Sequence, residues 1–293
     1  IYLVKDDINH LIEPLFGAKV ETSFVTSGGS INQTHVLNLT NGQRIFMKQN
    51  PSAPTDFFLA ETRGLKLLSQ VKNGPRIPKP VVVQSVSLPT FLLLEYIDSS
   101  SEDENFSEQF ALSLAELHRM SQEHYGLDHD NYIGSTPQKN RLEKDGIVFF
   151  REQRIDFQRQ LARRSGLLPV TIDKEIDSLC DELGKFLNIS GEKPALLHGD
   201  LWSGNYFPDS EGKPCVFDPA VYYGLREADL AMTELFGRLP QKFYDVYQEV
   251  FPMNPGYEER KDLFNLYHLL NHLNIFGSSY LSSVQQIVKR YTG

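Results

Sequence analysis

The chain of 293 residues carries a formal net charge of −9, with 40% hydrophobic and 23% charged residues. This composition is that of a folded protein with enough apolar residues for a large core and enough length for two lobes, so wholesale disorder is excluded. The acidic balance argues against a nucleic-acid partner, which needs a broad basic face, although it leaves room for a local basic pocket around a phosphorylated cofactor.

The first third of the chain predicts a small β-rich lobe with helices among its strands. Apolar residues at helical spacing predict helices at 3–16 and 56–70. The Asn41-Gly42 pair between two β-rich runs predicts a hairpin. The strands expected in this lobe lie at 19–26, 34–39, 44–49, 79–84 and 90–95.

The polar, acidic segment 98–104 follows the last of these strands and predicts a linker. Beyond it the pattern becomes mainly helical, with short strands and loops at 195–219. Helices are expected around 110–117, at 147–164, at 172–187 and from 227 almost to the end. The expected fold class is α+β in two lobes, at 1–97 and 98–293.

Cysteine usage and hydropathy favour a cytoplasmic protein. Cys215 lies in an apolar, strand-like run, so Cys180 and Cys215 are expected to be buried free thiols rather than a disulfide. No run approaches the ~18 apolar residues of a membrane span, and no charged-then-apolar signal opens the chain. We therefore expect no membrane partner.

The stretch ALLHGDLWSGN at 195–205 carries the strongest chemical signal. An apolar run leads to Asp200, Asn205 follows five residues later, and a second apolar run leads to Asp218. Kinases use this spacing: the first aspartate orients and deprotonates the acceptor hydroxyl, and the asparagine and second aspartate hold Mg²⁺. Either acid alone is explained equally well by a turn or a strand-end cap, but the joint spacing favours a phosphoryl-transfer site in a kinase-like fold.

The N-terminal lobe contains candidate groups for binding ATP. Lys48 lies on the third strand, where it can reach the α- and β-phosphates, and Glu61 on the next helix can pair with it. The glycine loop between the first two strands lets the backbone approach phosphates, although a plain hairpin turn explains it too. Backbone groups where the lobes join can read an adenine edge. The expected nucleotide-binding residues are Gly28, Gly29, Ser30, Lys48, Glu61, Glu95 and Ile97.

These motifs resemble the fructosamine kinase (ketosamine-3-kinase) family, which shares the protein-kinase-like fold of aminoglycoside phosphotransferases and choline kinases. An HGD motif with asparagine five residues later is common to many small-molecule kinases, whereas Trp202 and the DPA at 218–220 narrow the resemblance to ketosamine kinases. The stretches that carry it are SGGSIN at 27–32, FFREQRI at 149–155, HGDLWSGN at 198–205, FDPA at 217–220, YYGLREADLAMTELFG at 222–237 and NHLNIFGSSY at 271–280.

The resemblance implies ATP- and Mg²⁺-dependent phosphorylation of a sugar hydroxyl on a ketoamine, after which the adduct breaks down and the amine is deglycated. It implies that Asp200 is the catalytic base and that Asn205 and Asp218 are the metal ligands. Trp202 is expected to form a wall for the sugar, with packing between the lobes as the alternative. Some family members carry cysteine where Ser30 stands, so thiol-based control through this loop is not expected. A monomer is favoured.

Two other functions fit part of the pattern. An aminoglycoside or other small-alcohol kinase would share the core motif, and the acidic balance suits its cationic substrates, but Trp202 and DPA do not favour it. A pseudokinase scaffold would not need the complete catalytic set. That set is Lys48, Glu61, Asp200, Asn205 and Asp218.

Three further residues are candidates for a role near the site. His268 and His272 are four apart on a predicted helix, the spacing of two zinc ligands, but core packing is the preferred interpretation. Asp229 lies inside the helix after the DPA motif and is expected to brace the catalytic loop through hydrogen bonds.

Overall fold

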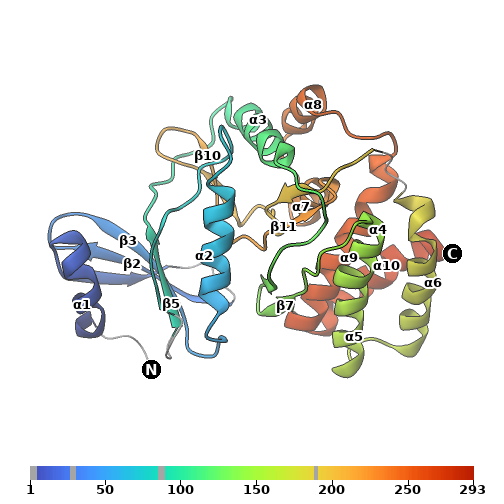
Figure 1. Ribbon diagram of the computed structural model, residues 1–293, viewed down its shortest axis with the longest axis horizontal. Coiled ribbons are helices and arrows are strands. Elements are labelled where there is room, and N and C mark those ends of the chain that lie inside the picture. The colour runs from blue at the N-terminus through green and yellow to red at the C-terminus, as the bar shows by residue number, and fades with distance from the viewer. Residues whose placement is uncertain (1–4, 27–30, 85–89, 188–190) are drawn as a thin grey trace.

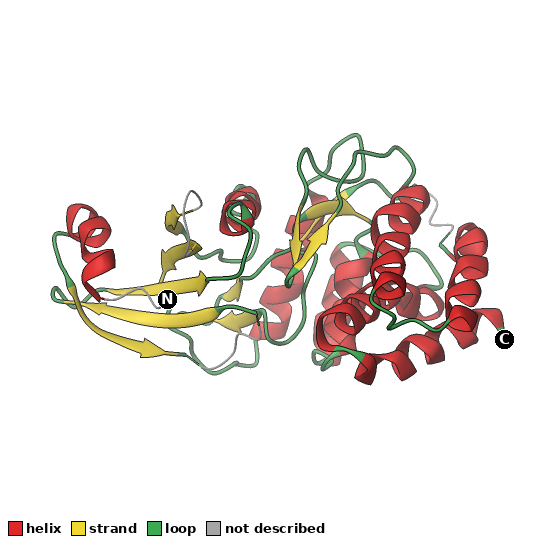
Figure 2. Cartoon of the chain, turned by 90° about the horizontal axis from the view of Figure 1, so that it is seen from below, coloured by secondary structure: helices red, strands yellow, loops and turns green. Residues whose placement is uncertain are grey.

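The computed structural model describes residues 5–26, 31–84, 90–187 and 191–293. It has an N-terminal antiparallel sheet and a larger, mainly helical C-terminal part, which confirms the α+β prediction (Figures 1 and 2). The division at residue 97 stays a prediction. No helix in the described ranges combines the length and the apolar character that crossing a bilayer requires.

Five strands in the described part of the chain form the N-terminal sheet, in the spatial order β1-β2-β3-β5-β4 with antiparallel neighbours. Gly42 closes the β2–β3 hairpin with a φ of +83°, as the Asn-Gly pair predicts. The elements of this part are α1 (Lys5–Phe16), β1 (Val20–Val25), β2 (Gln33–Leu39), β3 (Arg44–Asn50), α2 (Phe57–Leu68), β4 (Pro80–Gln84) and β5 (Thr90–Glu95).

Helices cover both faces of this sheet, so its interior strand β5 is apolar on both sides. Phe91 and Leu93 pack in the cluster that includes Ile8 and Ile12 of α1. Leu92 and Leu94 point to the other face and pack in the cluster that includes Phe58 of α2. Figure 1 shows α2 between the sheet and the helical part. The two-residue alternation of a strand therefore fixes which side chains meet which helix.

The C-terminal part contains helices around three short two-stranded ladders, β6–β7, β8–β11 and β9–β10. Its core is built on α9, where Leu263, Phe264 and Leu270 are almost completely buried. The helices are α3 (Phe106–Arg119), α4 (Gly146–Phe149), η1 (Phe150–Asp156), α5 (Phe157–Arg164), α6 (Val170–Phe186), α7 (Glu227–Leu235), α8 (Gln241–Val250), α9 (Tyr257–Phe276), η2 (Ser278–Tyr280) and α10 (Leu281–Thr292). The strands are β6 (Asn131–Ile133), β7 (Thr136–Gln138), β8 (Ala195–Leu197), β9 (Tyr206–Pro208), β10 (Pro214–Val216) and β11 (Tyr222–Gly224).

The helix predicted at 147–164 is interrupted by a π-helical segment, η1. This segment carries Arg154, which is fully buried and lies with its guanidinium carbon 3.8 Å from the ring centroid of Tyr222. The guanidinium also donates to Oδ1 of Asn140 at 2.8 Å. One π turn shifts the apolar pattern only slightly, so periodicity alone does not reveal it.

Cys180 and Cys215 are free and buried, as predicted. Cys215 lies on β10 and Cys180 on α6. Burial raises the pKa of each thiol to about 12, so both are held in the protonated form at neutral pH.

Candidate active site

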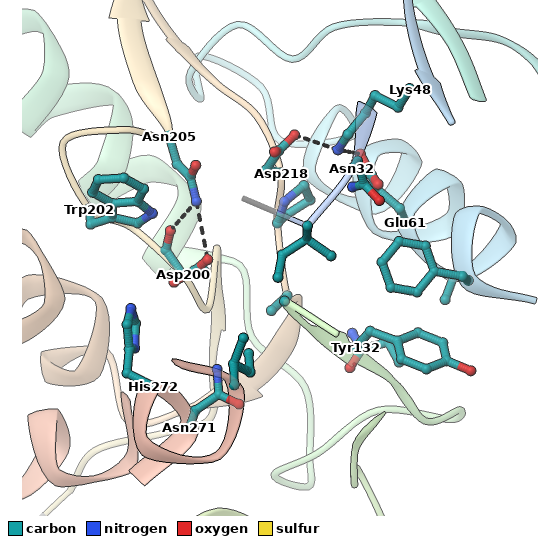
Figure 3. A pocket seen from close by; sticks show the side chains of 18 of the residues that line it. Asn32, Lys48, Glu61, Tyr132, Asp200, Trp202, Asn205, Asp218, Asn271 and His272 are labelled. Carbon is teal, nitrogen blue, oxygen red and sulfur yellow. Dashed lines mark hydrogen bonds and ion pairs between the residues drawn. The ribbon is translucent and has the colours of Figure 1, made fainter. Parts of the chain in front are cut away.

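The loop that carries Asp200, here called the catalytic loop, begins where β8 ends at Leu197. Its backbone conformation requires a glycine. Gly199 has a φ of +82°, and a Cβ atom at this position would lie 2.0 Å from the carbonyl oxygen of Ala220. The loop therefore passes directly against the DPA segment, and any side chain would push the two apart. Asp200 follows immediately and lines the pocket in Figure 3.

Asp229 of α7 holds this loop in place through hydrogen bonds to its backbone, as predicted. Its Oδ2 accepts the backbone N–H of His198 at 2.7 Å, and its Oδ1 accepts that of Gly199 at 2.9 Å. Burial alone would raise the pKa of Asp229, but the hydrogen bond and charge of His118 and the hydrogen bond from the Gly199 N–H hold it below its usual range. The carboxylate is therefore a charged acceptor fixed to two consecutive amides.

His198 connects the loop to the second apolar run. Its Nδ1 accepts the backbone N–H of Asp200 at 3.3 Å, which leaves Nε2 as the protonated nitrogen that donates to the carbonyl oxygen of Phe217 at 2.9 Å. Burial lowers the pKa of His198, which agrees with this neutral tautomer. The imidazole thus ties the chain just before Asp200 to the chain just before Asp218.

The β9–β10 ladder brings Asn205 and Asp218 to the same end of a hairpin. Tyr206 pairs with Val216, so the residues that flank these strands leave the ladder together. The amide nitrogen of Asn205 donates to the carbonyl oxygen and to Oδ2 of Asp200, at 2.8 and 3.2 Å. Asp218 has a left-handed backbone with φ of +56°, an uncommon conformation outside glycine that is frequently found at functional sites.

Lys48 reaches this end of the hairpin from the N-terminal sheet. Its Nζ lies 2.6 Å from Oε1 of Glu61 and 2.6 Å from Oδ1 of Asp218, as Figure 3 shows. Burial opposes the lysine charge, but the charges and hydrogen bonds of Asp218 and Glu61 outweigh it and raise the pKa of Lys48 above its usual value. The lysine therefore stays charged although only 2% of its side chain is exposed.

Asp200 is the carboxylate with the largest functional consequence. Burial raises its pKa to about 7, and the negative charges of Asp218 and Asp229 act in the same direction, while the Asn205 hydrogen bond opposes them. A carboxylate with a pKa near neutrality can accept a proton more readily than an ordinary aspartate. Asp200 has the position and basicity of a general base.

Trp202 lines the pocket beside Asp200 and contacts Phe236, with ring centroids 6.2 Å apart. Gly204 lies against the indole, because a Cβ atom there would come within 2.3 Å of the ring. Both contacts come from the C-terminal part, and the choice between a wall for the sugar and packing between the lobes stays a prediction. The indole is available as a wall for a ligand, and His272 lies on the same side of the pocket in Figure 3.

The structure brings together six of the sequence-predicted residues in one pocket: Lys48, Glu61, Asp200, Trp202, Asn205 and Asp218. Gly28, Gly29 and Ser30 lie outside the described residues. Glu95 and Ile97 do not line this pocket: the Glu95 carboxylate accepts a hydrogen bond from Arg76, and the Glu95 N–H donates to the carbonyl oxygen of Lys79.

In the described structure, His268 and His272 of α9 do not face a common position where both could bind one metal ion. His268 is almost completely buried, whereas His272 lines the pocket and donates from Nδ1 to the carbonyl oxygen of His268, 2.8 Å away. Since a carbonyl only accepts, this Nδ1 is protonated. The ring of His272 packs beside Phe236, which also contacts Trp202, and the ring centroids of His272 and Phe236 are 4.8 Å apart.

Several pocket residues were not predicted from the sequence as site residues. They come from β6, from the end of the glycine-loop motif and from α9: Asn32, Asn131, Tyr132, Asn271 and Ile275. Three of them lie inside stretches that carry the family resemblance, Asn32 in SGGSIN and both Asn271 and Ile275 in NHLNIFGSSY. Their location in these stretches was the sequence signal that could have identified them as site residues.

The donor set at the hairpin end fits a hard divalent cation. Asn205 uses its amide nitrogen toward Asp200, which leaves Oδ1 for a cation, and the carboxylate of Asp218 is 38% exposed into the pocket. The described residues contain no cluster of three or more His, Cys, Asp or Glu that could hold a metal alone. Mg²⁺ is usually held by one or two protein ligands together with substrate phosphates, so two oxygen ligands suit it.

The chain is similar to known proteins over almost its whole length. The model of the fructosamine kinase family matches residues 4–292. A probable ketoamine kinase from Vibrio parahaemolyticus is 40% identical over 278 residues, covering 94% of each chain. The chloroplastic protein-ribulosamine 3-kinase of Oryza sativa subsp. japonica is 39% identical over 271 residues, covering 90% of this chain and 77% of its own.

Solved structures extend the comparison to the fold. A candidate fructosamine-3-kinase from Haemophilus somnus 129PT superposes with a TM-score of 0.87 at 30% identity, covering 98% of this chain and 97% of its own. The aminoglycoside phosphotransferase APH(2'')-Ib has a TM-score of 0.65 at 16% identity, covering 99% and 98%. The second likeness shows the kinase-like fold alone.

Proposed function

We propose, because the chain belongs to the fructosamine kinase family, that it transfers the γ-phosphoryl group of ATP to a hydroxyl group of a ketoamine sugar. The observation that carries the proposal is one pocket in which the basic carboxylate of Asp200 lies between the indole of Trp202 and the Lys48–Asp218 pair. A sugar against the indole therefore has a base beside it and phosphate-binding groups opposite.

The polar pocket residues predicted from the sequence each have a role in this reaction. Asp200 orients the acceptor hydroxyl and accepts its proton while the sugar oxygen bonds to the γ-phosphorus and ADP leaves with the electrons of the broken P–O bond. Lys48, held by Glu61, contacts the phosphates. Asn205 and Asp218 would hold Mg²⁺, which would neutralise charge on the phosphate oxygens.

We extend the proposal to the nucleotide's other contacts. The backbone of Gly28, Gly29 and Ser30 approaches the phosphates, and the junction around Glu95 and Ile97 receives the adenine. Because the Glu95 N–H already donates to Lys79, the groups left for a base edge are the Glu95 carbonyl and the backbone of Ile97.

The acceptors in this proposal are ribulosyl and fructosyl amines, either free or attached to a protein lysine, and the outcome is deglycation of the amine. The variable amine points out of the cleft, because the described lining near Trp202 is aromatic and carries no carboxylate beyond the phosphoryl-transfer site. Among the described residues that line the pocket, the only carboxylates are Glu61, Asp200 and Asp218. A polycationic aminoglycoside would find no further counter-charge there.

Steady-state kinetics on a panel of acceptors tests the proposal. We expect ribulosyl-lysine and fructosyl-lysine to have higher kcat/KM values than kanamycin and choline, with Mg·ATP as donor. A higher kcat/KM for kanamycin or choline would contradict the ketoamine assignment and leave the kinase chemistry intact. The Asp200→Asn variant controls for contaminating kinases.

A further inference from the structure

We propose that Asn271 is a specificity-determining residue that donates a hydrogen bond to a second hydroxyl of the acceptor sugar, and that Gln158 positions it. This inference rests on the proposed function, because it presumes a ketoamine acceptor in the pocket. It adds a polar contact from α9, on the side of the pocket opposite the N-terminal sheet.

Asn271 lies at the edge of the pocket near the catalytic base. It is 3% exposed and lines the pocket together with Asp200, Trp202 and His272. In Figure 3 it lies beside His272, with its amide nitrogen directed toward the side of the pocket that carries Asp200. An oxygen-rich ligand between Asp200 and Trp202 would therefore meet this amide.

The orientation of the Asn271 amide follows from a backbone carbonyl that can only accept. The Gln158 carbonyl oxygen lies 2.9 Å from Nδ2 of Asn274, so this atom is the Asn274 donor. The same Nδ2 is 2.7 Å from Oε1 of Gln158, which places Nε2 of Gln158 on the opposite side of its amide. That Nε2 donates to Oδ1 of Asn271 at 3.1 Å. Asn271 therefore presents its Nδ2 donor to the pocket.

This donor has no acceptor among the residues that the structure describes, since the hydrogen bond of the Asn271 side chain runs through Oδ1. The relay behind it is rigid, because Gln158 is fully buried and bonded at both ends of its amide. A preorganised donor that needs an acceptor from the ligand discriminates strongly against ligands that lack one, because the buried donor is then left unpaired.

The chemistry of the acceptor assigns the contact to a hydroxyl other than the one that is phosphorylated. The attacked hydroxyl gives its proton to Asp200 and its oxygen to phosphorus. A ketoamine sugar offers further hydroxyl oxygens on neighbouring carbons, whereas choline offers none. Asn271 thus recognises the sugar rather than the amine.

The test replaces Asn271 with leucine, which keeps the branched shape of the side chain and removes the donor. We expect the KM for ribulosyl-lysine to rise about 3- to 10-fold, the loss of one neutral hydrogen bond, with the KM for ATP changed less than about twofold. The matched control is Asn265→Leu on the same helix. Asn265 is buried to a similar degree, 4% exposed, and its amide bonds to the Ala231 carbonyl instead of facing the pocket.

Gln158→Met provides a second variant outside the pocket. If Gln158 acts through Asn271, it also raises the sugar KM, and the double variant is no worse than Asn271→Leu alone. Kinetics of both wild type and Asn271→Leu on 4-deoxy and 5-deoxy ketoamines complete the cycle, because the analogue that lacks the recognised hydroxyl should bind equally well to the two proteins.

The outcomes separate this inference from the proposed function. A sugar KM for Asn271→Leu that equals that of Asn265→Leu, with wild type active on ketoamines, would overturn the role of Asn271 and leave the function standing. The role of Asn271 would also be overturned if Asn271→Leu raised the KM for both deoxy analogues as much as it raises the KM for ribulosyl-lysine. Absence of ketoamine turnover by wild type would instead contradict the proposed function.

Discussion

Asp200 is surrounded by groups that oppose its ionisation. Burial and the charges of Asp218 and Asp229 raise its pKa to about 7, and only the Asn205 hydrogen bond acts against them. A base is most effective when its pKa lies near the working pH, because it is then both deprotonated and able to hold a proton. The surroundings of Asp200 thus bring the pKa of its carboxylate close to neutral pH.

Replacing Asp200 with asparagine should abolish most turnover and leave nucleotide binding nearly intact. The amide cannot accept the hydroxyl proton, whereas Lys48, Glu61 and Asp218 remain in place. General-base removal typically costs ~10²–10⁴-fold in rate. We expect kcat to fall within that range while the Kd for ATP, measured by calorimetry, changes less than about threefold. Near-normal turnover by this variant would remove Asp200 from the mechanism.

The raised pKa also predicts a pH profile. Asp200 must be ionised to accept a proton, so kcat/KM for the ketoamine should fall about tenfold per pH unit below about pH 7. In the complex with Mg²⁺ the charge of Asp218 is neutralised, so the corresponding limb of kcat should lie at lower pH. An acid limb centred near pH 4 in kcat/KM would show that Asp200 has the pKa of an exposed carboxylate.

An independent check comes from stability. Because folding raises the pKa of Asp200 from 3.8 to about 7, the folded state binds the proton more tightly, and the stability this supplies is lost as pH rises through 7. Asp200→Asn should therefore increase the free energy of unfolding by about 3–4 kcal/mol at pH 8 relative to its effect at pH 4, since each pKa unit corresponds to about 1.4 kcal/mol. Denaturant unfolding at the two pH values measures this difference.

At the level of secondary structure, α7 acts as the support of the catalytic loop. Asp229 in its first turn accepts two loop amides, and its Oδ2 lies 3.2 Å from Nε2 of His118 on α3. The other nitrogen of His118 lies 2.7 Å from the hydroxyl of Tyr247 on α8. Three helices therefore fix the loop through one buried carboxylate.

Asp229→Asn should weaken this support without touching either substrate. The asparagine can accept one loop amide but places an NH₂ group against the other, which leaves a buried donor unpaired. We expect a loss of stability of about 2–4 kcal/mol and a kcat lowered at least tenfold, with the KM for ATP little changed. Thermal unfolding and steady-state kinetics measure the two effects. Asp245→Asn on the exposed side of α8 is the control, and equal kcat values for the two variants would contradict the bracing role.

The success of sequence-based prediction also varied by element. The strands of the sheet were predictable because their alternation and the Asn41-Gly42 turn are strong local signals. The β6–β7 hairpin, which carries Asn131 and Tyr132 into the pocket, was not predicted because its three-residue strands are too short to show a period. The π turn of η1 was missed for the related reason that it barely disturbs helical spacing.

In the molecule as a whole, polar contacts join the sheet to the helical part on two sides of the pocket. On one side Arg76 bonds both to Glu95 at the end of β5 and to the buried carboxylate of Asp209, each at 2.8 Å. On the other, the Tyr132 hydroxyl donates to Asp56 just before α2 at 2.7 Å. These contacts hold Lys48 in reach of Asp218 across the two parts.

Arg76→Ala should loosen the side where we place the adenine. Arg76 is 37% exposed, so its pair with Glu95 contributes little by itself, but Asp209 loses a partner while almost completely buried. We expect a stability loss of about 1–2 kcal/mol and a KM for ATP raised several-fold, with the ketoamine KM changed less. Kinetics with each substrate varied in turn distinguish these effects, and a larger rise in the ketoamine KM would refute this placement of the adenine.

The complete pocket depends on long-range contacts that a single sequence does not specify. Spacing predicted that Asp200, Asn205 and Asp218 belong together, because they flank neighbouring short strands. Asn271 and His272 come from α9, where buried residues continue around the helix and no stripe marks a functional face. Their place beside Trp202 follows from tertiary packing, so the sugar-facing side of the site became visible only in the structure.

The central claim is that Asp200 directs the γ-phosphoryl group of ATP onto a sugar hydroxyl of a ketoamine. Phosphorus NMR of a reaction with Mg·ATP and ribulosyl-lysine, run in parallel with wild type and Asp200→Asn, tests it most directly. We predict a new phosphomonoester signal, coupled to a sugar proton and equimolar with ADP, for wild type and its near absence for the variant. ADP formation with inorganic phosphate as the only product, or an equal phosphomonoester signal from both proteins, would contradict the account.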